Sequence, residues 1–141
     1  MAVRCVMIAL LSTMVAYLAP NIAYARSLSP QEKASVRDVV IKDFKDPDSA
    51  KFKWLPFSQR RWWLSDSQHA GRSKFLSCGL VNAKNSFGGY IGYTPYAVGI
   101  ALEKNKIVEI ELVGIAQGNQ ALIDYIPALC KGSGQDTAQA R

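Results

Sequence analysis

A glycine-rich stretch in the middle of the chain carries the side chains best suited to hold a ligand. Amide, ammonium and phenol groups gather there: Asn82, Lys84, Asn85, Tyr90 and Tyr93. Backbone N–H groups of the intervening glycines could face an anion, and the tyrosines add hydroxyls on broad apolar rings. The stretch therefore predicts a binding site for an anionic or sugar-like group.

The same residues also fit a purely structural role. Glycines permit turn and bulge geometry, asparagine side chains satisfy nearby backbone groups, and tyrosine rings pack. The spacing of a nucleotide phosphate-binding loop is absent. The ligand-binding and structural interpretations both stay open.

A second cluster joins two cations to two indoles, at Arg60, Arg61, Trp62 and Trp63. Such a cluster can lie at a membrane interface, stack on sugars or bases, or anchor a protein partner. Equally, one indole could fill the core while the other covers a sheet edge. Nucleic acid is a weak candidate, because neither an RNA-recognition nor a helix-turn-helix pattern is present.

Catalytic patterns find less support. His69 is the single histidine and lies in a polar segment with Ser65, Asp66 and Ser67, which are too close in sequence to argue a triad. Glu109 and Glu111 could form a carboxylate pair, but they alternate with apolar residues, as is typical of the solvent-exposed face of a strand. We predict no catalytic residue, no metal site and no cofactor.

The N-terminus has the pattern of a secretory signal peptide over residues 1–25. Arg4 precedes an apolar run of about 13 residues, shorter than the roughly 20 that span a bilayer. Pro20 follows, and Ala23 and Ala25 supply the small residues of a cleavage site. We expect a mature chain that starts at Arg26, is periplasmic or secreted, and has no transmembrane anchor.

Cleavage would leave Cys78 and Cys130 as the only cysteines. An even pair in an oxidising compartment predicts a disulfide, which would stabilise the fold by about 4 kcal/mol in the chain-entropy model. A metal site would need more ligands than this pair and one histidine supply.

The chain is moderately basic, with 17 Lys and Arg against 11 Asp and Glu. Outside a cell, positive charge favours anionic partners such as lipopolysaccharide, teichoic or nucleic acid polymers, or an acidic protein face. Solubility alone is an equally good explanation of the charge.

Two helices are predicted at the ends of the mature chain. Ser29, Pro30 and Glu32 form a capping box that begins a helix running to about residue 45, and Pro47 ends it. Gly118 and Asn119 begin a second helix, which Pro127 kinks or restarts and Gly132 closes. Residues 133–141 lack apolar side chains, and we expect a disordered tail.

Strands are predicted between the helices, over residues 51–57, 75–83, 96–102 and 107–113, with a connecting loop over 58–73. In the third strand, large side chains alternate with Ala97, Gly99 and Ala101, so that a helix or another backbone can approach its bare face closely. In the fourth, Val108, Ile110 and Leu112 are predicted to face inward. The fold class is α+β: a single domain over residues 26–132, with an antiparallel sheet of about four strands flanked by an N-terminal and a C-terminal helix and one disulfide.

Residues 45–52 (KDPDSAKF) and 78–96 (CGLVNAKNSFGGYIGYTPY) resemble the patterns KDPxSAxF and CGxVNxKNxxGGYxGYxxF. These patterns mark a set of small exported bacterial proteins, mostly Gram-negative and mostly uncharacterised. The resemblance implies export and a shared fold, and it implies no reaction. Tyr96 stands where the pattern more often has Phe.

The sequence as a whole favours an exported, non-enzymatic binding module of the cell envelope or secreted fraction, with a protein partner. A binder of an anionic envelope glycan or lipid is the alternative, and a cell-wall hydrolase is third.

Overall fold

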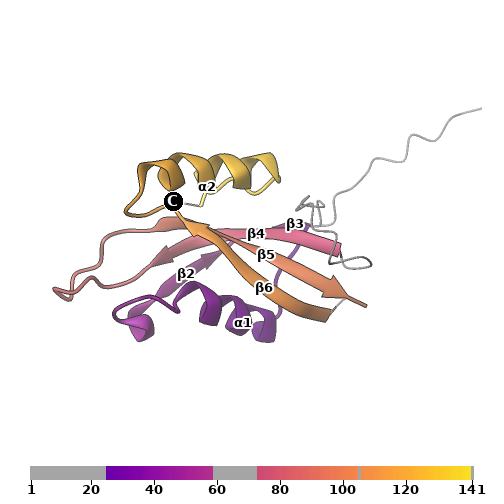
Figure 1. Cartoon of the computed structure of the whole chain (residues 1–141), viewed down its shortest axis with the longest axis horizontal. Helices are drawn as coiled ribbons and strands as arrows, with labels where there is room; N and C mark the ends of the chain where they lie inside the picture. The colour runs from indigo at the N-terminus through magenta and orange to yellow at the C-terminus, as the bar shows by residue number, and fades with distance from the viewer. Residues whose placement is uncertain (1–24, 59–72, 105, 141) are drawn as a thin grey trace, which may run out of the picture.

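The computed structural model describes residues 25–58, 73–104 and 106–140 and forms three layers, with a helix on each face of a sheet (Figure 1). The four-stranded sheet is antiparallel with the order β2-β4-β5-β6. Its strands are β2 (Lys51–Trp54), β4 (Ser73–Asn82), β5 (Thr94–Glu103) and β6 (Lys106–Ile115). A separate two-stranded pair joins β1 (Ala25–Arg26) to β3 (Phe57–Ser58). The predicted α+β class with an antiparallel sheet is confirmed.

Helix α1 (Pro30–Val40) starts with the predicted capping box, in which Ser29 and Glu32 each bond the other's backbone N–H. It ends about five residues earlier than expected, because a turn from Ile41 to Phe44 replaces the last helical turn. Phe44 still packs against the core from this turn. A 3-10 helix, η1 (Pro47–Ser49), then leads into β2.

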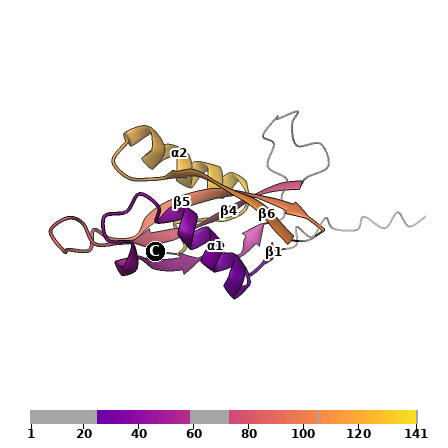
Figure 2. The ribbon, with the colours of Figure 1, turned by 60° about the horizontal axis from the view of Figure 1, so that its bottom comes forward.

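The two faces of the sheet carry two separate cores, one under each helix. Val36 and Val40 of α1 pack with the large side chains of β5, among them Tyr96, Val98 and Ile100. Figure 2 shows α1 crossing the sheet on the side opposite α2. On the α2 face, the small β5 side chains admit the helix as predicted, and Ile126 packs there against Ala97.

Gly79 of β4 is required by the core on the α1 face. A Cβ atom at this position would lie 2.6 Å from the Tyr96 hydroxyl and 2.7 Å from its ring. The bare backbone of Gly79, which pairs with Tyr96 across the strands, thus makes room for the phenol.

The prediction that Val108 faces inward is wrong, since its side chain is 46% exposed. The pairing of β5 with β6 shifts register between Ala101 and Leu102, whose partners are Glu109 and Ile107. This bulge leaves Val108 without an opposite residue and turns Ile107 to the core instead. Ile110 and Leu112 pack against the core as expected.

Helix α2 (Gln120–Gly132) is capped by Asn119, and it continues through Pro127 as one helix. The predicted disulfide is present: Cys78 and Cys130 join β4 to α2 with their Cα atoms 6.0 Å apart. Gly114 of β6 lets this helix approach, since a Cβ there would lie 3.1 Å from Ile126 Cδ1.

The C-terminal segment does not behave as the disordered tail that its composition predicts. Gln135 and Thr137 are 3% and 2% exposed. Gln135 bonds the backbone of β4, and the carbonyl of Ala140 accepts a bond from Lys53 Nζ at 2.9 Å. Polar residues hold this segment on the sheet by hydrogen bonds, which a search for apolar residues cannot detect.

Candidate functional site

At the tip of the connection between β4 and β5, residues 85–89 form a turn held by four hydrogen bonds. Asn85 Oδ1 accepts from the N–H groups of Phe87 at 3.0 Å and Gly89 at 3.1 Å. Asn85 N–H donates to Gly89 C=O at 2.9 Å, and Gly88 N–H donates to Asn85 C=O at 3.0 Å. Gly88 has a φ of +80°, which glycine adopts without strain. The turn is therefore pre-organised, and Asn85 serves it.

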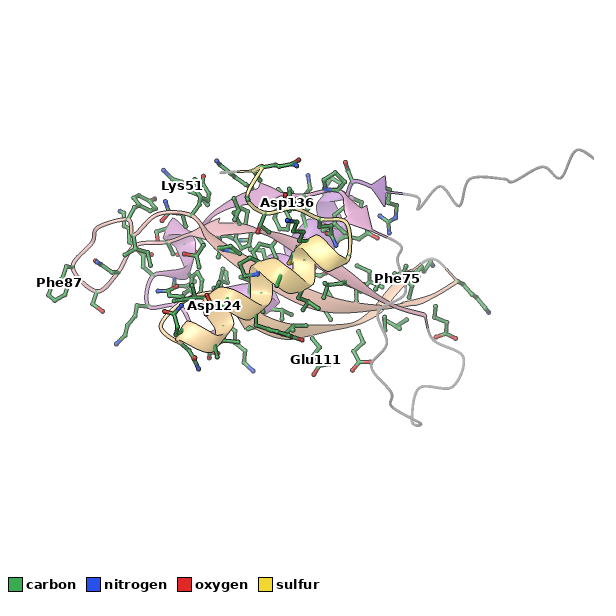
Figure 3. All side chains as sticks on the ribbon, turned by 90° about the horizontal axis from the view of Figure 1, so that it is seen from above. Lys51, Phe75, Phe87, Glu111, Asp124 and Asp136 are labelled. Atoms are coloured by element: carbon green, nitrogen blue, oxygen red, sulfur yellow. A yellow bond between two sulfur atoms is a disulfide. The ribbon has the colours of Figure 1, made fainter. Side chains whose placement is uncertain are left out.

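Phe87 lies at the tip of this turn with 97% of its side chain exposed, and Figure 3 shows it at the far end of the molecule. Tyr90 and Ile91, which follow it along the chain, are 42% and 50% exposed. Sequence reasoning did not select Phe87. The available signal was a large apolar residue placed directly before two glycines of a turn.

Asn82 also serves the loop. Its Oδ1 accepts a bond at 3.1 Å from the N–H of Gly92, a residue with a φ of +99°. For both asparagines the structure thus supports the structural interpretation, because the loop backbone uses their side-chain oxygens.

The other three predicted ligand residues gather with two lysines of β2. We call this group the Lys–Tyr cluster: Lys51, Lys53, Lys84, Tyr90 and Tyr93. Lys51 Nζ lies 4.5 Å from the centroid of the Tyr90 ring, and Lys84 Nζ lies 5.8 Å from the same centroid. Lys53 Nζ lies 4.5 Å from the Tyr93 centroid. These are distances at which a cation is attracted to a ring face.

Strand β2 positions its lysines by simple alternation. Lys51 and Lys53 pair with Asn82 and Leu80, while Phe52 and Trp54 turn to the other face and pack against the core. Sequence reasoning recognised the alternating strand but did not assign its two lysines to a site. Their tyrosine neighbours come from a distant part of the chain.

Ser49 of η1 fixes the base of the loop. Its carbonyl accepts a bond from the Tyr90 hydroxyl at 3.2 Å, and its Oγ accepts one from Lys84 N–H at 3.0 Å. The guanidinium of Arg37 holds the same segment from α1 by bonds to the carbonyls of Pro47 and Ala50. The Tyr90 ring is therefore held in place at its hydroxyl end.

The described residues place no acidic side chain against the Lys–Tyr cluster. Within the described ranges, the ion pair that the structure contains joins Arg26 to Glu32, and no carboxylate lies within 4.0 Å of Lys51, Lys53 or Lys84. The ammonium groups of Lys51 and Lys84 thus approach one ring of the β4–β5 loop, while Lys53 Nζ lies over Tyr93 and also donates to the carbonyl of Ala140.

A pocket of about 470 Å³ lies between the β4–β5 loop, the segment after α1 and the end of β6. Its size falls in the range of small-molecule sites. Two lysines and one aspartate line it, Lys45, Lys84 and Asp43. Its apolar lining comes from Phe44, Val81, Ala83, Ile91 and Ile115.

The remaining candidates divide into two groups. Arg60, Arg61, Trp62, Trp63, Ser65, Asp66, Ser67 and His69 lie outside the described residues, as does most of the predicted signal peptide. Glu111 is exposed on β6 as predicted, whereas Glu109 is half-buried. Among the residues that the structure describes, no three His, Cys, Asp or Glu side chains gather as metal ligands would. No helix in these ranges is long and apolar enough to cross a membrane.

Comparison of the chain with protein-family models, with curated proteins and with solved structures found no match.

Proposed function

We propose that this protein is an exported, non-enzymatic binding module that docks a protein partner through its β4–β5 turn. The observation that carries the proposal is Phe87, 97% exposed at the tip of a turn that four hydrogen bonds hold in shape. Burial of a large, water-exposed aromatic side chain by a partner lowers the free energy of the complex. Aromatic residues of this kind dominate the energetics of many protein interfaces.

The rigidity of the turn strengthens this interpretation. A docking loop that is ordered before binding loses little conformational entropy on binding, so more of the contact energy appears as affinity. Tyr90 and Ile91, three and four positions further along the same loop, add exposed apolar surface to it. Export is supported by the signal-peptide pattern and by a disulfide that suits an oxidising compartment.

A binder of an anionic lipid is the second candidate, and the pocket beneath the loop favours it. An acyl chain could lie on the apolar lining while Lys45 and Lys84 face an acidic headgroup. Titration with a short-chain phosphatidylglycerol would test this candidate, with Lys45→Glu and Ile91→Ser expected to weaken binding. If the titration of the unaltered protein gives no heat of binding, the lipid-binding candidate is excluded. The cell-wall hydrolase remains a prediction without a supporting observation.

The protein-binding proposal is tested by capture of partners from envelope extract on the mature chain. Phe87→Ser should abolish capture of the specific partner. The matched control is Tyr125→Ser, which removes an exposed aromatic side chain from α2. Equal capture by both variants and the unaltered protein would contradict the proposal.

A further inference from the structure

We infer that the protein partner is acidic where it meets this chain, and that the Lys–Tyr cluster binds its carboxylates. This inference rests on the proposed function and names the chemistry of the partner surface. It adds Lys51 and Lys53, which lie outside the turn, to the docking surface of Phe87. In Figure 3, Lys51 and Phe87 lie toward the same end of the molecule.

The first argument is the arrangement of charge around Tyr90. Two ammonium groups approach one ring, Lys51 at 4.5 Å and Lys84 at 5.8 Å from its centroid. The negative face of the ring offsets part of their mutual repulsion, and the bond from the Tyr90 hydroxyl to Ser49 holds the ring in place. An anion placed at both ammonium groups would relieve the rest of the repulsion.

The second argument distinguishes an acidic protein from a sugar polymer. Sugar rings are held by stacking on bare aromatic faces, but here lysines already lie over Tyr90 and Tyr93. Phe87, which no lysine covers among the cation–ring contacts of the described residues, gives the same end of the molecule an apolar anchor. Cations beside an apolar anchor match a protein surface on which acidic residues border an apolar pocket.

The third argument is spacing. Lys51 and Lys53 are separated by two positions on one strand, so their Cα atoms lie about 7 Å apart on the same face. Alternate residues of an extended acidic segment have the same spacing. Several carboxylates of one partner segment can therefore meet the cluster together, which raises affinity above that of a single exposed ion pair.

The test measures binding of fluorescently labelled poly(L-glutamate) and of the random glutamate–tyrosine copolymer to the mature chain. The double variant Lys51→Glu, Lys84→Glu should weaken binding of both by about tenfold. The control Lys106→Glu, Lys131→Glu changes net charge equally. Lys106 begins β6, opposite Glu103 at the end of β5, and Lys131 lies in the last turn of α2. This control should weaken binding by less than about twofold.

Two further variants test the role of Tyr90 as a positioning residue. Tyr90→Leu removes the ring and should weaken polyglutamate binding, whereas Tyr90→Phe keeps the ring and should retain most of it. If charge reversal unfolds the chain, the milder Lys51→Gln, Lys84→Gln variant gives the same comparison. Thermal unfolding of each variant reports whether the fold is intact.

The outcomes separate this inference from the proposed function. An equal loss of polyglutamate binding in the two double charge-reversal variants would overturn the inference. Absence of polyglutamate binding by the unaltered chain would overturn it as well. Stronger binding of heparin or of phosphatidylglycerol vesicles through the same lysines would also overturn it, in favour of a glycan or a membrane. If only Phe87→Ser abolishes partner capture and the lysine variants do not alter it, the proposed function stands without this inference. If the unaltered chain prefers the glutamate–tyrosine copolymer to polyglutamate, and Phe87→Ser removes this preference, the result would support both the proposed function and this inference.

Discussion

The side-chain amide of Gln135 bonds the backbone of Cys78 and continues the sheet where β2 has ended. Its Oε1 accepts from Cys78 N–H at 2.9 Å, and its Nε2 donates to Leu76 C=O at 2.8 Å. Strand β2 ends at Trp54, which pairs with Gly79, so the next β4 residues have no β2 partner. One carboxamide thus takes the place of a neighbouring strand beside the disulfide.

Gln135→Ala is therefore expected to lower the free energy of unfolding by about 2 kcal/mol, because it leaves two buried backbone groups without partners. Urea denaturation of the mature chain measures the change. Gln120→Ala, on the exposed side of α2, is the matched control and should cost less than about 0.5 kcal/mol. Equal effects of the two substitutions would mean that Gln135 does not hold the C-terminal segment on the sheet.

Tyr96→Phe is expected to leave stability unchanged or to raise it by about 1 kcal/mol. The Tyr96 hydroxyl is buried and has no hydrogen-bond partner among the described residues. Burial raises the pKa of this phenol, so it stays neutral. Thermal unfolding would measure the effect, and a loss above about 1 kcal/mol would reveal a hydrogen bond to this hydroxyl.

Glu32 makes the stability of the folded chain depend on pH. The guanidinium of Arg26, and then the backbone N–H of Ser29, lower the pKa of this carboxyl from 4.5 to about 2, although burial opposes them. Because the folded state favours the charged form, this contribution is present above pH 4.5 and is lost as the pH falls toward 2.

Glu32→Gln should therefore cost about 1 kcal/mol at neutral pH and make the fall in stability on acidification shallower. Glutamine can still accept the capping bond of Ser29. Chemical denaturation at a series of pH values measures both effects. An unchanged pH profile in Glu32→Gln, relative to the exposed control Asp38→Asn, would contradict this assignment.

The export prediction concerns the start of the mature chain. Mass spectrometry of the exported protein should find Arg26 at the N-terminus, with Cys78 and Cys130 joined in one non-reduced peptide pair. An intact Met1 on the exported form, or two free thiols, would refute the prediction that this chain is processed in an oxidising compartment.

Local patterns in the sequence were sufficient for much of the fold. The capping box at Ser29 and the alternation in β5 depend on residues near each other in the chain, so both were predictable. The exposure of Val108 was not predictable, because a bulge is a property of the pairing between two strands. Gln135 was missed for the same kind of reason, since its partners belong to a distant strand.

The arrangement of the candidate site residues could be predicted only in part. Lys84 does lie near Tyr90, but Lys51 joins this pair, and Lys53 meets Tyr93, through contacts between segments that are distant in the chain. Asn82 and Asn85 have amide side chains of the kind that bind ligands, yet their oxygens accept hydrogen bonds from the backbone of the loop. Residue type alone does not show whether a polar group is already satisfied by its own backbone.

The central claim, that the β4–β5 turn docks a protein, is tested most directly by photo-crosslinking in the native envelope. A benzophenone amino acid placed at position 87 of the full chain should give one dominant crosslinked protein adduct on irradiation. The same probe at position 125, exposed on α2, should give little. Absence of an adduct at position 87, or equal yields at the two positions, would contradict the claim.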